Sequence, residues 1–151
     1  MDVDVVAEMN DEAVAPFLRQ LGSDYYASEP TIRDAIRRKT CFNLVHYPTS
    51  FKVDVFISRD RSFDRDCMAR AIVGEIGSTA KLQIPVASPE DTIISKLEWY
   101  KIGDETSDQQ WRDVATVLKL LGDQADLDYL RRAAESVGVD ELLARLRAMN
   151  Q

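Results

Sequence analysis

Two strand-like segments of this chain carry carboxylates in the middle of apolar runs. The chain begins MDVDVVAEM, and FKVDVFI follows at residues 51–57. Because side chains alternate across a strand, Asp2 and Asp4 are expected to project from one face, and Asp54 to share a face with Lys52. A buried carboxylate without a partner is unfavourable by several kcal/mol. These acids must therefore be solvated, paired with a cationic side chain or bound to a metal ion.

Two interpretations of the mid-strand acid remain open at this point. Lys52 can neutralise Asp54 in a simple ion pair. Alternatively, carboxylates from two neighbouring strands can hold a hard divalent ion such as Mg²⁺, which takes oxygen ligands. For Asp2 and Asp4 alone, a solvated chain end is the simpler explanation, because D-x-D pairs occur by chance in acidic proteins.

The pattern along the chain predicts an α+β fold, with a small mixed sheet that contains an antiparallel hairpin and a C-terminal helical bundle that shares the core. The expected strands cover residues 2–9, 41–47, 51–58 and 81–88. The expected helices cover residues 11–22, 28–39, 59–77, 88–103, 107–122, 126–138 and 139–150. We expect an α/β core over residues 1–87 and a helical region over residues 88–151 that packs on it.

Local signals support several of these helix boundaries. Asp11 is expected to cap the first helix, and Gly22 to end it. Ser88 followed by Pro89 and two acids is a strong start signal for a helix. Gly122 is expected to end the helix that begins near residue 107.

Composition narrows the classes of function. The formal net charge is -7, which argues against broad binding of nucleic-acid backbones. The densest basic segment, Arg33 to Lys39, has the spacing of a solvated helix face. Two cysteines without C-x-x-C spacing, and the absence of a signal-peptide or membrane-spanning pattern, lead us to expect a cytoplasmic protein with no membrane association.

The order of these motifs resembles a known family. DVDVV, then a helix, then a hairpin whose second strand reads FKVDVFI, is similar to the nucleotidyltransferase fold of the DNA polymerase β superfamily, and especially to small bacterial AbiEii-like and related uncharacterised proteins. The resemblance implies Asp2 and Asp4 as paired Mg²⁺ ligands and Asp54 as the third ligand. It also implies a nucleoside triphosphate substrate, and a toxin–antitoxin or mobile-element setting.

The likeness extends into the segment VASPEDTIISKLEWYKIGDETSDQQWRDVATVL. In such relatives a helix carries a lysine, and the next helix begins with an acid and an R-D or K-D pair. The resemblance thus implies that Lys96 approaches the triphosphate and that Asp108, Arg112 and Asp113 line or brace the site. Without the family, the same residues would be helix-capping acids and an exposed lysine.

The chain departs from the family at its start. These relatives place a glycine-serine or glycine-glycine turn upstream of the D-x-D, where it receives the triphosphate. This sequence begins at the D-x-D strand, so we expect Met1 to be a start inside a longer ancestral pattern. Loss of the turn would remove charge stabilisation and bare a strand edge, which favours a homodimer.

Other chemistry-bearing residues have simpler explanations. His46 is the only histidine, and no cysteine or histidine lies near it in sequence, so a structural role is favoured over zinc binding. Trp99, Tyr100 and Trp111 are expected to fill the joint between two helices, with base stacking as the alternative. Tyr25 and Tyr26 fall in a linker, where they could gate a pocket.

Two functional hypotheses follow. The first is a nucleotidyltransferase that moves a nucleotide from a nucleoside triphosphate to a protein or RNA hydroxyl, with Mg²⁺ as cofactor, Asp54 assisting the hydroxyl and Lys96 at the triphosphate. The second is a catalytically inactive relative that acts as a binding or oligomerisation module.

Overall fold

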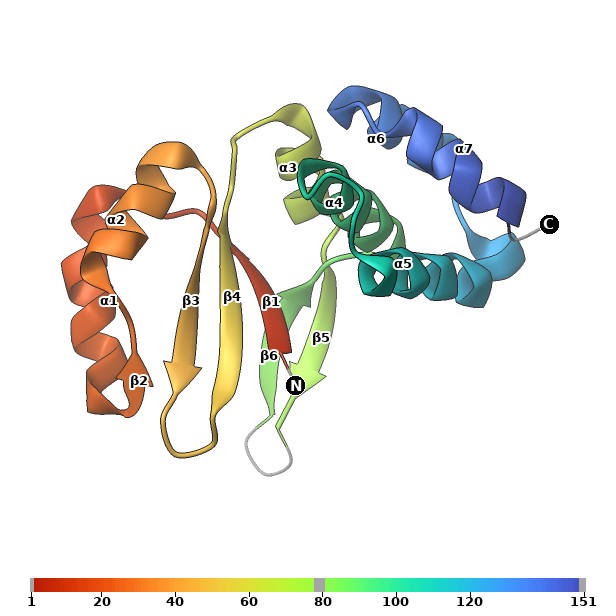
Figure 1. The fold of residues 1–151 in the computed structure, drawn as a ribbon. Coiled ribbons are helices and arrows are strands. Elements are labelled where there is room, and N and C mark those ends of the chain that lie inside the picture. The colour runs from red at the N-terminus through yellow and green to blue at the C-terminus, as the bar shows by residue number, and fades with distance from the viewer. Residues whose placement is uncertain (1, 78–80, 150–151) are drawn as a thin grey trace. The chain divides into compact units, whose positions relative to one another are not determined.

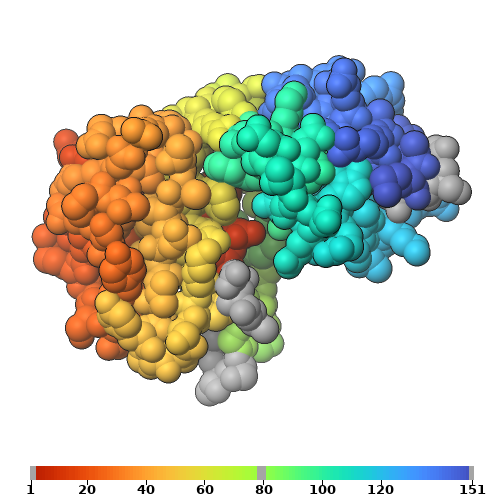
Figure 2. Space-filling model, viewed as in Figure 1, coloured from red at the N-terminus to blue at the C-terminus, as the bar shows by residue number. Residues whose placement is uncertain are grey.

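The computed structural model describes residues 2–77 and 81–149, and of Asp2 it describes the backbone alone. The chain divides into two compact units, Met1–Arg61 and Ser62–Gln151. Figure 2 shows them in space-filling form, the first from red to gold and the second from yellow-green to blue. The division lies at residue 61, whereas the sequence pattern placed the boundary after residue 87.

The first unit combines a four-stranded sheet with two α-helices (Figure 1). Its elements are β1 (Asp2–Ala7), η1 (Asp11–Ala13), α1 (Val14–Leu21), η2 (Gly22–Asp24), β2 (Tyr25–Tyr26), α2 (Glu29–Arg38), β3 (Cys41–His46) and β4 (Phe51–Ile57). The strand order is β1-β4-β3-β2. The predicted hairpin is confirmed as β3 and β4. The segment predicted as a linker contains a short strand, β2.

The register of the sheet places the acidic strands side by side. β1 runs parallel to β4, with Asp4 opposite Asp54. β3 runs antiparallel to β4, with Asn43 opposite Asp54, and Tyr26 of β2 lies opposite Val45 of β3. Residues paired across neighbouring strands project from the same face. We call the face that carries Asp4, Tyr26, Cys41, Asn43, Val45, Lys52, Asp54 and Phe56 the polar face.

The opposite face of this sheet is covered by helices. Its buried side chains pack against those of α1 and α2 in one apolar cluster: Val14, Ile32, Ala35, Phe42, Leu44, Val55 and Ile57. The alternation along β4 is the one predicted, because Val55 and Ile57 are buried and Lys52 and Asp54 are not. The helices therefore settle which face of the sheet stays polar.

At α1 the predicted capping residue was wrong, and the predicted end at Gly22 was confirmed. The side chain of Asn10, and not that of Asp11, accepts a hydrogen bond from the backbone N–H of Ala13 at 3.0 Å. Asp11 instead forms an ion pair with Arg33 at 2.5 Å. Gly22 ends α1 with φ of 68°, a left-handed conformation that glycine adopts without a steric penalty.

The second unit is built mostly of helices (Figure 1). Its elements are α3 (Ser62–Arg70), β5 (Ile72–Ile76), β6 (Leu82–Val86), α4 (Pro89–Ile102), α5 (Asp108–Leu121), η3 (Gly122–Gln124), α6 (Leu127–Val137) and α7 (Asp140–Met149). The helix predicted over residues 59–77 was too long. Its last third is β5, which pairs with β6 in a separate two-stranded sheet.

The strand character of β5 has a local cause. Ile72 and Val73 are β-branched, and Gly74 is a poor helix residue, so the segment IVGEI favours a strand once a partner is present. Gly74 also allows a close approach, because a Cβ atom there would lie 2.6 Å from Cγ2 of Val86 on β6. The partner strand thus decides what the local pattern left ambiguous.

The second unit has a hydrophobic core of its own, where the sequence pattern predicted one core shared by the whole chain. The buried side chains of this cluster include Phe63, Ile93, Ile94, Leu97, Val114, Leu118, Leu130, Ala134, Leu142, Leu143 and Leu146. The predicted start of α4 is confirmed, because Ser88 accepts a hydrogen bond from the N–H of Asp91 at 3.1 Å. Gly122 ends α5 as predicted.

None of the helices within residues 2–77 and 81–149 combines the length and the apolar character that crossing a bilayer requires.

Candidate functional site

Two acidic residues occupy neighbouring positions on the polar face of the first unit. Asp4 and Asp54 occupy directly opposite positions on the parallel strands β1 and β4. Opposite side chains on neighbouring strands have Cβ atoms about 5 Å apart, a separation that one cation can bridge. The Asp4 side chain is exposed, and that of Asp54 is 20% exposed. Both strands are therefore needed to assemble this acidic pair.

Asp54 also has two partners within the same face. The ammonium nitrogen of Lys52 lies 3.0 Å from each of its carboxylate oxygens. The side-chain amide of Asn43, on β3, donates a hydrogen bond to Oδ1. The ion pair expected as the simple explanation of Asp54 is thus present. Because the Lys52 side chain is 42% exposed, its attraction to Asp54 is weakened by solvent.

The structure describes only the backbone of Asp2. It pairs with Lys52 in the register of β1 and β4, one step along the polar face from Asp4. Its side chain lies outside the described part of the chain. Among the described residues, no three His, Cys, Asp or Glu side chains are grouped so that they could hold a metal ion.

The side-chain oxygens of Asp4 and Asp54 are of the chemical type that binds divalent cations. Asp4 and Asp54 supply hard carboxylate oxygens, which Mg²⁺ and Mn²⁺ prefer. Lys52 works against such an ion, because its ammonium group occupies the Asp54 oxygens. Cation binding at this pair would therefore require Lys52 to move away from Asp54.

The remaining predicted site residues lie in the second unit. Lys96 is a half-buried residue of α4, and Asp108 is the exposed first residue of α5. Arg112 and Asp113 are exposed residues of α5, one turn further along. Asp108 lies in the first turn of its helix, where a carboxylate is favourable to the helix dipole.

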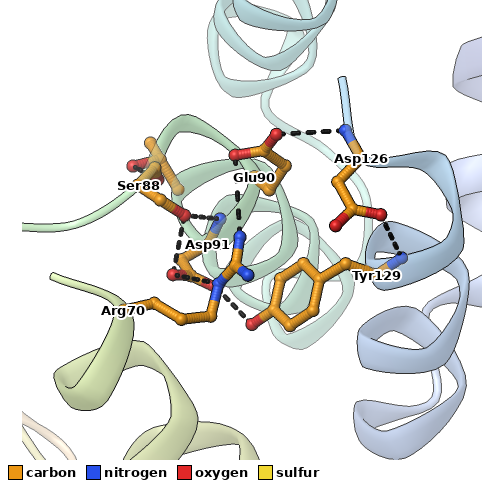
Figure 3. A network of polar contacts seen from close by, with 7 residues as sticks. Arg70, Ser88, Glu90, Asp91, Asp126 and Tyr129 are labelled. Atoms are coloured by element: carbon orange, nitrogen blue, oxygen red, sulfur yellow. Dashed lines mark hydrogen bonds and ion pairs between the residues drawn. The ribbon is translucent and has the colours of Figure 1, made fainter. Parts of the chain in front are cut away.

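The second unit contains a buried polar cluster that the sequence did not predict. Figure 3 shows it: Asp91, at the start of α4, accepts hydrogen bonds from the hydroxyl groups of Ser88 and Tyr129. The Ser88 bond to Oδ2 measures 2.7 Å, and Tyr129 donates to Oδ1. Asp91 is only 1% exposed, so these bonds compensate the loss of hydration of a charge.

Arg70 supplies the opposite charge to this cluster (Figure 3). Its Nε atom lies 3.5 Å from Oδ2 of Asp91, and a terminal nitrogen lies 4.0 Å from Oε2 of Glu90. Its guanidinium carbon lies 3.7 Å from the centre of the Tyr129 ring. Glu90 in turn accepts a hydrogen bond from the backbone N–H of Asp126 at 3.2 Å. The cluster joins the end of α3 to the starts of α4 and α6.

Two side chains in or next to this cluster, Cys67 and Tyr129, have raised pKa values. Burial, and then the charge of Asp91, raise the pKa of Cys67 to about 12. Burial and the hydrogen bond to Asp91 also raise the pKa of Tyr129 well above its ordinary value. Both groups are therefore neutral at physiological pH and poor nucleophiles.

Only part of this cluster left a signal in the sequence. Ser88 was recognised as a helix cap, and Asp91 stands three residues later, in the position of the acidic partner in a capping box. Arg70 and Tyr129 reach Asp91 from other helices, so no local pattern indicates them.

Several aromatic and basic residues have structural partners. Tyr25 packs against the ring of His46, with centroids 4.8 Å apart, and His46 Nδ1 lies 2.8 Å from the hydroxyl of Thr49. Tyr100 packs on Trp111 at 5.2 Å, which agrees with the predicted joint between α4 and α5. Each arginine and lysine side chain between Arg33 and Lys39 has an acidic partner, namely Asp11, Glu29, Asp34 or Asp60.

Comparison with known proteins adds no family assignment. No protein-family model matches the chain, and no curated protein matches it at a significant level.

Proposed function

We propose that this protein is nucleotidyltransferase-like and that its polar face binds Mg²⁺ together with a nucleoside triphosphate. The observation that supports the proposal most is the position of Asp4 directly opposite Asp54 on parallel strands. A carboxylate pair of this kind offers the oxygen ligands of ions that also hold phosphates. Asp2, one step along the same strand, is proposed as the third ligand.

In the proposed reaction a hydroxyl of a protein or RNA attacks the α-phosphorus of the triphosphate. A new phosphorus–oxygen bond forms, the bond to the β-phosphate breaks, and pyrophosphate leaves with the displaced electrons. Asp54 would accept the proton of the attacking hydroxyl. A bound Mg²⁺ would neutralise phosphate charge.

The alternative is an inactive relative that acts as a binding or oligomerisation module. One observation favours it: Asp54 is already neutralised by Lys52 and hydrogen-bonded by Asn43. A carboxylate with two local partners has less capacity to hold a cation. In this alternative the acidic pair is a remnant, and the polar face or the edge strand β1 contacts a partner.

Metal-dependent stabilisation separates the two functions. The midpoint of thermal unfolding is measured while Mn²⁺ or Mg²⁺ is titrated, with and without ATP, for the natural chain and for Asp4→Asn and Asp54→Asn. A ligand that binds only the folded state raises the midpoint until the site is saturated. We expect such a shift in the natural chain, and its loss in both variants.

The matched control for this experiment is Asp34→Asn. Asp34 is an acid of α2 that pairs with Arg37 and Arg38, so it belongs to the same unit but to a different surface. Its variant should keep the full shift. If millimolar metal and ATP leave the midpoint of the natural chain unchanged, the alternative function stands.

The proposed setting is a reducing cytoplasm, in a bacterial toxin–antitoxin or mobile-element context. Cys41 and Cys67 are both free thiols, which suits such a compartment. We also propose a homodimer, because β1 is an edge strand of its sheet and exposes Val6. Light scattering on an eluting peak would give the mass directly, and a mass of 17.1 kDa would contradict the dimer.

A further inference from the structure

The polar face continues beyond the acidic pair to an exposed aromatic ring. Across the sheet, Tyr26 of β2 is opposite Val45 of β3, and Val45 is opposite Lys52 of β4. These three side chains therefore lie in one row, next to the row that contains Asn43, Asp54 and Asp4. One row thus presents the ammonium group of Lys52, the side chain of Val45 and the phenol ring of Tyr26, and the next row presents the two carboxylates and the amide of Asn43.

Tyr26 and its neighbour Tyr25 have opposite environments. Tyr25 lies on the covered face, where it belongs to the apolar cluster and packs on His46. Tyr26 is 52% exposed, although a tyrosine ring is a large apolar body that is usually covered. The packing of the first unit thus accounts for Tyr25 and leaves the Tyr26 ring available to a ligand.

From these observations we infer that the polar face holds a nucleotide, with its base stacked on Tyr26 and its phosphates beside Lys52, next to the acidic pair. The inference rests on the proposed function and adds the groups that would recognise the base and the phosphates. It assigns a role to an aromatic residue that lies on a different strand from any of the acids.

The spacing of the sheet fits such a ligand. Neighbouring strands lie about 4.8 Å apart, so the backbone of Tyr26 is about 10 Å from that of Lys52 across the sheet. The Cα atoms of Lys52 and Asp54, two residues apart along β4, are about 7 Å from each other. A nucleoside with its phosphate chain is extended enough to reach from the ring to the ammonium group and on to the acids. Lys52 would then exchange Asp54 for phosphate oxygens.

The first test distinguishes recognition of the base from recognition of the phosphates. Isothermal titration compares Mn²⁺ with ATP and Mn²⁺ with inorganic tripolyphosphate, for the natural chain, Tyr26→Val and Tyr26→Phe. Stacking on an aromatic side chain is worth roughly tenfold in affinity or more. We expect Tyr26→Val to bind ATP about tenfold more weakly and tripolyphosphate unchanged. Tyr26→Phe, which keeps the ring, should bind ATP normally.

The matched control is Leu120→Val. Leu120 is another exposed large apolar side chain, but it belongs to α5 of the second unit. Its variant should bind ATP like the natural chain. An unchanged ATP affinity in Tyr26→Val, or an equal loss for tripolyphosphate, would overturn the assignment of Tyr26 and leave the proposed function intact. Absence of binding by both ligands would overturn the two together.

Cys41 offers a second readout that needs no activity. It is exposed on the polar face, two residues from Asn43, whereas Cys67 is half-buried in the second unit. We expect Mn²⁺ with ATP to slow the alkylation of Cys41 by iodoacetamide several-fold, as measured by mass spectrometry, and to leave Cys67 unaffected. The protection should disappear in Asp54→Asn. Alkylation of Cys41 at the same rate with saturating ATP would place the nucleotide elsewhere and overturn the inference.

Discussion

The guanidinium group of Arg70 stacks 3.7 Å from the centre of the Tyr129 ring, while the hydroxyl of that ring donates a hydrogen bond to Asp91. One side chain of α6 is thus held at its ring face by α3 and at its polar end by α4. Asp91, at 1% exposure, depends on these neighbours because a buried charge without partners is strongly unfavourable. The cluster therefore ties three helices of the second unit together.

Removal of a single hydroxyl tests this cluster. Tyr129→Phe keeps the ring under Arg70 but leaves one oxygen of Asp91 without its donor. We expect the free energy of unfolding to fall by about 1–3 kcal/mol, measured by urea denaturation. Tyr47→Phe, which removes a hydroxyl from an exposed ring, should change it by less than about 0.5 kcal/mol. Equal effects of the two substitutions would show that the Tyr129 hydroxyl does not stabilise the fold.

The raised pKa of Cys67 predicts a loss of stability at alkaline pH. Its ordinary value is 9.0, and the folded environment raises the pKa to about 12. Between these values the unfolded chain releases the thiol proton and the folded chain retains it, so rising pH favours unfolding. Below pH 9 this contribution is fully present. It is lost progressively as the pH approaches 12.

The measurement is urea denaturation at pH 8, 9 and 10 for the natural chain and for Cys67→Ala. We expect the natural chain to lose stability more steeply above pH 9, by at most about 1.4 kcal/mol per pH unit and by less because Cys67 is partly solvated. Tyr129 is present in both chains, and burial and Asp91, the larger causes of its raised pKa, are common to both, so most of its contribution cancels in the comparison. Parallel slopes would contradict the raised pKa.

Lys52→Met should have opposite effects on two ligands of the polar face. Removal of the ammonium group takes the cationic partner away from Asp54, whose Oδ1 keeps the hydrogen bond from Asn43, so Mn²⁺ alone should bind a few-fold more tightly. The effect is modest because Lys52 is 42% exposed. Inorganic tripolyphosphate with Mn²⁺ should bind more weakly, because a positive charge beside the phosphates is lost. Isothermal titration measures both, and a change of the same sign for the two ligands would be inconsistent with this role of Lys52.

Gly74→Ala tests the pairing of β5 and β6. The new methyl group would lie 2.6 Å from Cγ2 of Val86, which is closer than van der Waals contact allows. We expect faster hydrogen exchange at the backbone amides of β5, because the two strands must separate or twist. The double variant Gly74→Ala/Val86→Ala removes the clashing methyl group and should restore slow exchange. Unchanged exchange in the single variant would mean that the strands do not pair this closely.

The structure differs from the local sequence pattern at residues 59–77 and at residue 10. The apolar residues of DRDCMARAIVGEI fit a helix nearly as well as a strand, and only the pairing of Ile72–Ile76 with Leu82–Val86 selects the strand. Asn10 and Asp11 are both good helix caps, and the ion pair between Asp11 and Arg33 leaves the cap to Asn10. In both cases a contact with a distant residue decides between two local choices of similar energy.

The sequence by itself determined the element types that depend on neighbours along the chain: the β3–β4 hairpin, the start of α4 at Ser88, the end of α5 at Gly122, and the placement of Lys52 and Asp54 on one face of a strand. Alternation and capping act within a few residues, so they are readable without coordinates. The tertiary structure alone decided that β1 lies parallel to β4, which sets Asp4 opposite Asp54 and Tyr26 in the row of Lys52. It alone joined Arg70, Asp91 and Tyr129, because these contacts depend on how separate helices pack and on the loss of hydration that packing imposes.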